Sequence, residues 1–143
     1  MTPAEFSTVR ALGWAGMLPF ALLLVVAILG APAPLRLLLL AYGVAILAFL
    51  CGSLWSALIT HPPSDARALV VSNVLVLAAV PAPLLPLSWA CLLLAVLFGM
   101  HAVAEAYWLR GRWPRRYMRL RLQLTPTAVA LLLLAALAAS NRG

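Results

Sequence analysis

The sequence predicts an all-α integral membrane bundle of five transmembrane helices, forming a single transmembrane domain over residues 1–143. Hydrophobic residues make up 66% of the chain and charged residues only 9%, whereas soluble domains carry about a quarter charged residues. Five apolar runs, separated by helix breakers, each approach the roughly 20 residues that a helix needs to cross a bilayer. A chain of 143 residues has no length left for a second, soluble domain.

The first two predicted spans end at clear breaks. The first covers about residues 12–29 and ends at the sequence GAPAP, residues 30–34. The second covers about residues 35–60 and ends at HPPSD, residues 61–65. Clusters of proline, glycine and small polar residues mark turns. Pro19 lies inside the first span, where it predicts a kink.

Three further spans follow, at about residues 68–85, 87–109 and 120–139. The third is the weakest, because residues 68–80 alone rise only about 20 Å at 1.5 Å per residue. A basic segment at 110–119, predicted to be a cytoplasmic loop, separates the last two spans. Pro126 predicts a kink in the fifth span.

The arginines predict the orientation of the bundle. If the third span crosses, eight of the ten basic residues share one side of the membrane, and Arg36 and Arg142 lie on the other. Because positive charge accumulates on the cytoplasmic side, the N-terminus should be cytoplasmic and the C-terminus outside. All ten basic residues are arginine in an Ala- and Leu-rich chain. This composition is typical of GC-rich bacterial genes, so we expect a multi-pass protein of the bacterial inner membrane.

Polar residues inside the spans concentrate toward the predicted cytoplasmic side. Unpaired polar groups are costly in hydrocarbon, and ionisable ones normally turn toward each other or toward water. We therefore predict one polar cluster there, formed by His101, Glu105, Ser53, Ser56, Ser72, Asn73, Gln123 and Thr125.

His101 and Glu105, one helical turn apart, leave two interpretations open. Glu105 could reach toward Arg110 or Arg112 while His101 hydrogen-bonds a neighbouring helix, both in structural roles. Alternatively, the pair could relay or sense protons near neutral pH.

The basic segment predicts contact with lipid headgroups. Pro114 is a good first helical residue, and the arginines recur on one face opposite Trp113 and Tyr117. We expect anionic headgroups to bind Arg110, Arg112, Arg115, Arg116, Arg119 and Arg121. Nucleic acid is a poor partner for arginines held at a bilayer surface, and we expect none.

The sequence predicts no metal ion and no cofactor. Haem ligation by His61 and His101 is disfavoured, because the two histidines are expected at different depths in the membrane and could not easily bind the same haem. Cys51 and Cys91 lie in apolar runs without a metal-binding spacing, so we expect two free thiols. Close helix packing is predicted where small residues recur every four positions, at Ala41 and Ala45, at Ala48, Gly52 and Ser56, and at Ala95 and Gly99.

Three stretches resemble an uncharacterised family of small membrane proteins, a domain of unknown function, that includes mitochondrial transmembrane protein 69. They are LGWAGMLPF at 12–20, AYGVAILAFLCGSLW at 41–55 and PRRYMRLRLQLT at 114–125. Three residues depart from the family pattern: Cys51 replaces a usual glycine, Leu54 an expected basic residue and Arg116 a usual tryptophan. The resemblance implies five membrane helices and no established reaction. If the family's chemistry needs the basic residue, Leu54 places that chemistry in doubt here.

These observations favour a non-catalytic accessory or assembly subunit of a larger inner-membrane complex, with other membrane-protein subunits as partners. The chain is small, its loops are short, and it lacks HExxH, GxSxG and paired aspartates. The alternative is a small transporter or proton-linked carrier with a cytoplasm-facing polar pocket.

Overall fold

A computed structural model describes residues 2–60, 65–109, 111 and 113–142, and all regular secondary structure among them is helical. The elements in chain order are α1 (Pro3–Ala15), α2 (Leu18–Leu29), α3 (Ala33–Thr60), α4 (Ala66–Ala79), the short 3₁₀ helix η1 (Ala82–Leu84), α5 (Leu87–Trp108) and α6 (Arg115–Ser140). Five stretches among them are long and apolar enough to cross a membrane. The predicted all-α fold with five long apolar helices is confirmed.

The first apolar run is broken into α1 and α2 at Gly16 and Met17, shortly before Pro19. Proline lacks an N–H and its ring clashes with the carbonyl four residues earlier, so it favours the first turn of a new helix and kinks or breaks a helix elsewhere. The break leaves the Gly16 carbonyl free to accept a hydrogen bond from the Tyr42 hydroxyl of α3, at 3.0 Å. The interruption predicted at Pro19 is confirmed, whereas α6 continues as a helix through Pro126.

Two helices begin earlier than their predicted spans. The first run was expected from residue 12, but α1 begins at Pro3, where Thr2 and Glu5 form a capping box. The last was expected from residue 120, but α6 begins at Arg115, directly after Pro114. Capping residues and a preceding proline start helices regardless of hydropathy. The predicted loop 110–119 is correspondingly shorter.

The third span is assembled from two pieces. Asp65 caps the start of α4 by accepting a hydrogen bond from the Arg67 backbone N–H at 2.8 Å. α4 ends at Ala79, and the chain continues through η1 to Leu84, so the candidate span Ala66–Leu84 has 19 residues. Prolines 81 and 83 cannot donate helical hydrogen bonds, which explains the change from α to 3₁₀ geometry.

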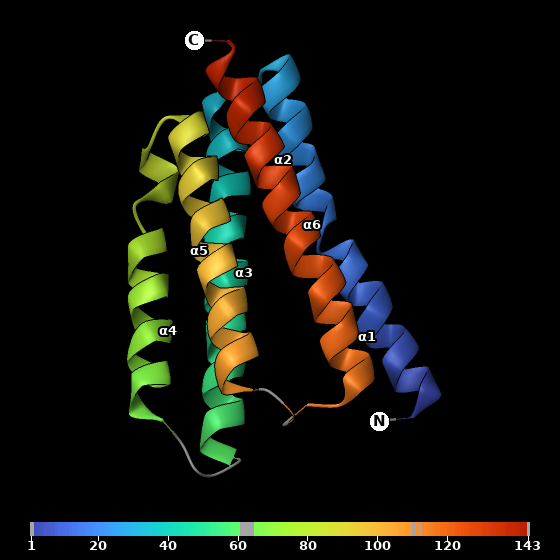
Figure 1. Cartoon of the computed structure of the whole chain (residues 1–143). Helices are drawn as coiled ribbons and strands as arrows, with labels where there is room; N and C mark the ends of the chain where they lie inside the picture. Colours follow the sequence, from blue (N-terminus) through green and yellow to red (C-terminus); the bar gives the residue numbers. More distant parts are fainter. Residues whose placement is uncertain (1, 61–64, 110, 112, 143) are drawn as a thin grey trace.

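The long helices run alternately up and down (Figure 1). α3, α4 and α5 pack together, while α2 and α1 follow the two halves of α6. The main core includes Phe20 and Phe98, whose rings meet edge to face at 5.6 Å. Gly43 is buried beside this core. A larger residue would be crowded at this position, because a Cβ would approach the Leu94 Cδ1 atom to 3.0 Å.

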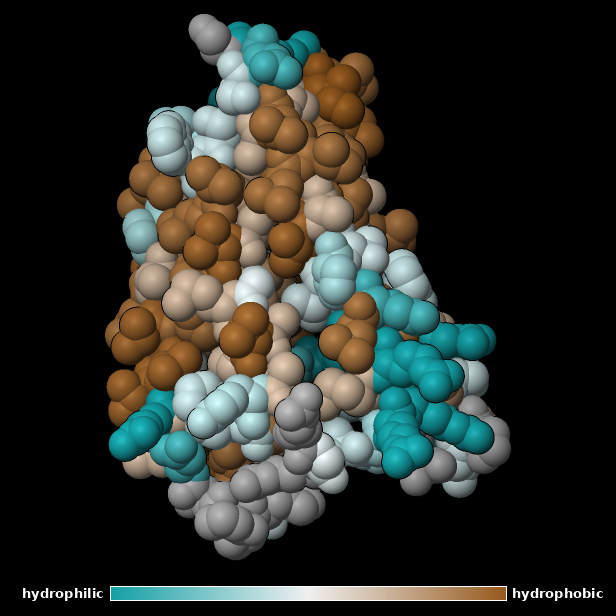
Figure 2. Space-filling view, in the orientation of Figure 1, coloured by the Kyte–Doolittle hydropathy of each residue, from teal (hydrophilic) through white to brown (hydrophobic). Residues whose placement is uncertain are grey.

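The outer surface is strongly apolar. Figure 2 shows hydrophobic residues over most of the visible face, with hydrophilic residues gathered toward the ends. Exposed large side chains include Leu77 of α4, Val103 of α5 and Leu137 of α6. Large exposed apolar areas mark surfaces that contact membrane or other proteins, and here they extend along helices of membrane-spanning length.

Candidate functional site

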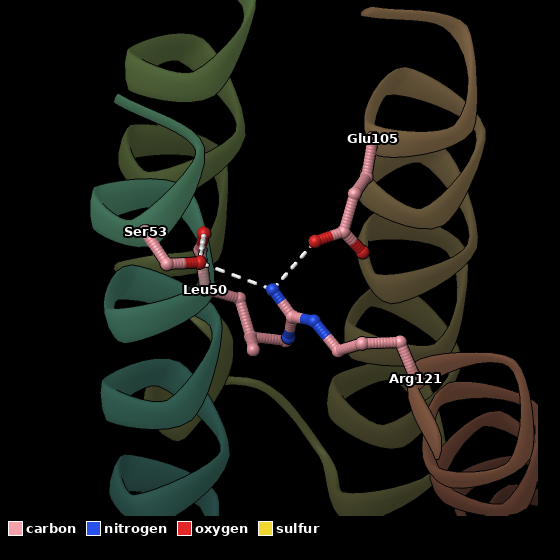
Figure 3. A network of polar contacts seen from close by, with 4 residues as sticks. All are labelled: Leu50, Ser53, Glu105 and Arg121. Atoms are coloured by element: carbon pink, nitrogen blue, oxygen red, sulfur yellow. Dashed lines mark hydrogen bonds and ion pairs between the residues drawn. The ribbon is translucent and has the colours of Figure 1, made fainter. Parts of the chain in front are cut away.

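A buried ion pair lies between α5 and α6. The Arg121 Nη2 atom donates to Glu105 Oε1 at 2.5 Å, and the two side chains are only 9% and 5% exposed. The same Nη2 atom donates to Ser53 Oγ of α3 at 3.0 Å. The Ser53 hydroxyl in turn donates to the Leu50 carbonyl at 2.7 Å. One guanidinium therefore joins three helices (Figure 3).

Two aromatic rings complete the environment of Arg121. The guanidinium carbon lies 5.3 Å from the Trp113 ring centre and 5.6 Å from that of Tyr117. The two rings meet edge to face at 4.8 Å. Cation–π contacts within about 6 Å contribute roughly 0.5–2 kcal/mol, more when desolvated. A carboxylate, a hydroxyl and two rings thus compensate this buried charge.

The structure corrects the placement of Arg121, which the sequence assigned to the headgroup-binding arginines. Arg121 is only 7% exposed, like its neighbours Leu120 and Thr125 on the buried face of α6. Residues four positions apart share a face of a helix, so Arg121 turns inward with Thr125, while Arg115 and Arg119 share an outward face and Arg116 also points outward. Those three arginines are exposed. Arg110 and Arg112 lie outside the described residues.

His101 lies one turn from Glu105 on α5 and is completely buried. Among the described residues, neither imidazole nitrogen has a hydrogen-bond partner. The Leu50 carbonyl interacts with the ring electrostatically, but outside hydrogen-bond geometry. Among the described residues, Glu105 is paired with Arg121; Arg110 and Arg112, which the sequence suggested as its partners, lie outside them.

The other members of the predicted cluster separate. Ser53 joins the ion pair and Thr125 is buried on α6. Ser72 is buried and Asn73 exposed, and both donate to the Leu69 carbonyl of their own helix. Ser56 and Gln123 are exposed on the outer surface. Serine and asparagine can satisfy their donors on the preceding helical turn, so they need not face the interior.

A second polar contact lies near the start of α4. The Trp108 indole N–H, at the end of α5, donates to Asp65 Oδ2 at 3.0 Å. The backbone N–H of Arg67, and then the Trp108 indole, hold the pKa of Asp65 below its usual value. The sequence does not predict this contact, because Asp65 stands at the end of the turn sequence HPPSD and Trp108 is 43 residues away. His61, considered there as a haem ligand, lies outside the described residues.

Five apolar membrane-length helices, enclosing a compensated ion pair, define a multi-pass α-helical membrane protein. A family model described as a protein of unknown function (DUF3429) matches residues 6–137. The chain belongs to this family. No curated protein and no solved structure matches it.

Proposed function

We propose that this protein is a non-catalytic accessory or assembly subunit of a larger complex in the bacterial inner membrane. The observation that carries the proposal is a groove of about 400 Å³ between α3 and α4, open to the outside of the bundle. Small and polar residues form part of its lining, including Gly52 and Asn73. The relation to mitochondrial transmembrane protein 69 rests on the three sequence stretches and belongs to the same proposal.

The groove offers close access to the backbone of α3. A Cβ at Gly52 would have no neighbouring heavy atom within 4 Å. Gly52 belongs to a row of small residues along α3 that also includes Ala41, Ala45 and Ser56, and we call this row the Gly52 stripe. Those three residues are also exposed. The sequence predicted that this stripe brings helices together, and in the described chain it faces outward. Small residues allow membrane helices to approach closely, so a second helix fits there.

Asn73 gives this surface a polar centre. It lies near the middle of the span Ala66–Leu84 and is exposed, and among the described residues only the Leu69 carbonyl accepts a hydrogen bond from its amide. An amide presented to hydrocarbon without its full set of partners is unfavourable. A helix seated in the groove would supply hydrogen-bond partners, worth about 1–2 kcal/mol in model membrane peptides.

The internal ion pair agrees with a structural role. The charges of Glu105 and Arg121 compensate each other, and Ser53 accepts a further hydrogen bond from Arg121, so neither charge needs a substrate as its counter-ion. This arrangement supports a packing function more directly than it supports the alternative of a proton-linked carrier.

Native mass spectrometry of the protein, extracted from its own membranes in mild detergent, tests the proposal. Wild type should carry a distinct membrane subunit in fixed stoichiometry. Gly52→Leu places a side chain in the groove, starting from a Cβ that meets nothing within 4 Å, and should reduce the bound subunit about tenfold. Gly99→Leu on α5 is the matched control, because a Cβ there also meets nothing within 4 Å, and it should retain the subunit.

Two results would overturn this function. One is a lone monomer or a homo-oligomer in the wild-type preparation. The other is an equal loss of the subunit in Gly52→Leu and Gly99→Leu, which would mean that the α3–α4 groove is not the contact.

A further inference from the structure

A second groove, of about 420 Å³, lies between α1, α3 and α6. Its volume falls in the range of about 300–1,000 Å³ typical of ligand pockets. Its walls are mainly apolar and include Leu12, Phe49 and Leu124. The groove exists because the break before Pro19 directs α1 along α6 and away from α3 (Figure 1).

Arg121 lines this groove and retains an unused donor. Its Nη2 atom serves Glu105 and Ser53, but its buried Nε atom has no hydrogen-bond partner among the described residues. Leaving a buried donor without an acceptor is unfavourable, because the group has lost its hydrogen bonds to water. The Arg121 side chain that borders this apolar groove therefore has one buried N–H without an acceptor oxygen among the described residues.

Positive charge is exposed at the same end of α6 as the Arg121 part of the groove. Arg116 and Arg119 directly precede the lining residues Tyr117 and Leu120, Arg115 lies one residue before Arg116, and Arg10 follows the lining residue Val9 on α1, against the single carboxylate of Glu5 on the described part of α1. Figure 2 shows hydrophilic residues gathered over the lower half of α6. Arginines near a membrane surface attract anionic lipid headgroups, so an anionic group is favoured there.

The order of these features along α6 matches one class of molecule. Arg121 lies about 9 Å deeper than Arg115 at 1.5 Å per residue, and the apolar lining continues past it to Ala128. A glycerophospholipid presents the same order: phosphate, ester carbonyl, acyl chain. We propose that this groove holds one acyl chain of an anionic glycerophospholipid, with the phosphate on the exposed arginines and an ester carbonyl accepting from Arg121 Nε.

Lipid retention by the full-length protein tests this site. The purified, delipidated protein is incubated with dioleoyl phosphatidylglycerol or dioleoyl phosphatidylcholine, and bound lipid is counted by native mass spectrometry. The anionic lipid should be retained about tenfold better. Leu124→Trp fills the groove, and Arg121→Lys keeps a cation near Glu105 while removing Nε. Each should reduce retention about tenfold, whereas Leu134→Trp, on an exposed part of α6 outside the groove, should not.

A photoactivatable phosphatidylglycerol, with the reactive group in its acyl chain, gives a readout on the unaltered protein. Crosslinks should map to the α1, α3 and α6 residues of the groove. Crosslinks spread over α4 and the outer face of α5, or equal retention of the two lipids, would overturn the proposal. Displacement of phosphatidylglycerol by equimolar oleate would also overturn it, because the ligand would then be a free carboxylate.

Discussion

At the scale of single residues, the two neighbouring ionisable groups on α5 differ in their partners. Glu105 is ion-paired with Arg121, while His101, one turn away, is fully buried and has no hydrogen-bond partner among the described residues. The sequence predicted both groups in one inward-facing cluster. It could not separate their roles, because the partner of Glu105 comes from a helix whose rotation the sequence leaves open.

Removing the charge of Glu105 should strongly destabilise the bundle. Glu105→Gln leaves the Arg121 cation buried without a counter-charge, and we expect the free energy of unfolding to fall by about 3–5 kcal/mol. The double variant Glu105→Leu, Arg121→Met should recover most of this loss, because the pair is replaced by apolar groups of similar size. Denaturant unfolding in detergent, followed by circular dichroism, measures both.

Glu5→Gln is the control for this substitution. Glu5 is exposed in the capping box of α1, and glutamine also serves in such a box, so the unfolding free energy should change little. An unchanged value for Glu105→Gln itself would contradict the structural role assigned to the ion pair.

At the scale of elements, local sequence signals predict where the helices begin and end. They do not predict which helices contact each other. Pro19 explains the break between α1 and α2, and Pro114 explains the start of α6. The outward direction of the Gly52 stripe was not predictable, because small residues favour close packing without indicating which helix supplies the partner.

The contact between Asp65, before the start of α4, and Trp108, at the end of α5, predicts that stability depends on pH. The hydrogen bonds from Arg67 and Trp108 favour the ionised Asp65, so its pKa is lowered on folding. Their stabilisation is therefore complete above the unfolded pKa, about 3.9, and is lost as the pH falls through the lower folded value. The NMR signal of the Trp108 indole N–H, assigned with Trp108→Phe, should shift with a midpoint below about 3.9.

Asp65→Asn provides the comparison for that titration. Asparagine can still cap the helix but does not ionise, so the Trp108 signal should lose this transition. A wild-type midpoint at or above 3.9, or the same transition in Asp65→Asn, would show that ionisation of Asp65 does not stabilise its contact with Trp108.

At the scale of the whole molecule, the described termini lie at opposite ends of the bundle (Figure 1). The start of α1, the end of α3 and the start of α6 share one end, and the C-terminus lies at the other. Exposed arginines of α6 lie at the end shared with α1. With five spans, the distribution of charge predicts that this end is cytoplasmic.

Cysteine labelling tests this orientation. Cys51 and Cys91 are buried, so the background should be low. In intact cells, a membrane-impermeant maleimide should label Asn141→Cys, whereas Ala4→Cys and Ala66→Cys should react only after lysis. The reverse pattern would show that the positively charged end faces outward.

The sequence by itself determined the class of protein, the five apolar helices and the positions of their main breaks. These properties depend on local quantities: the hydropathy of about 20 neighbouring residues, and the inability of proline to continue a helix. Only the tertiary structure decided that Arg121 turns inward to Glu105, that Asp65 meets Trp108 and that the Gly52 stripe remains uncovered. Those outcomes depend on the rotation and packing of helices distant in the chain, which hydropathy does not specify.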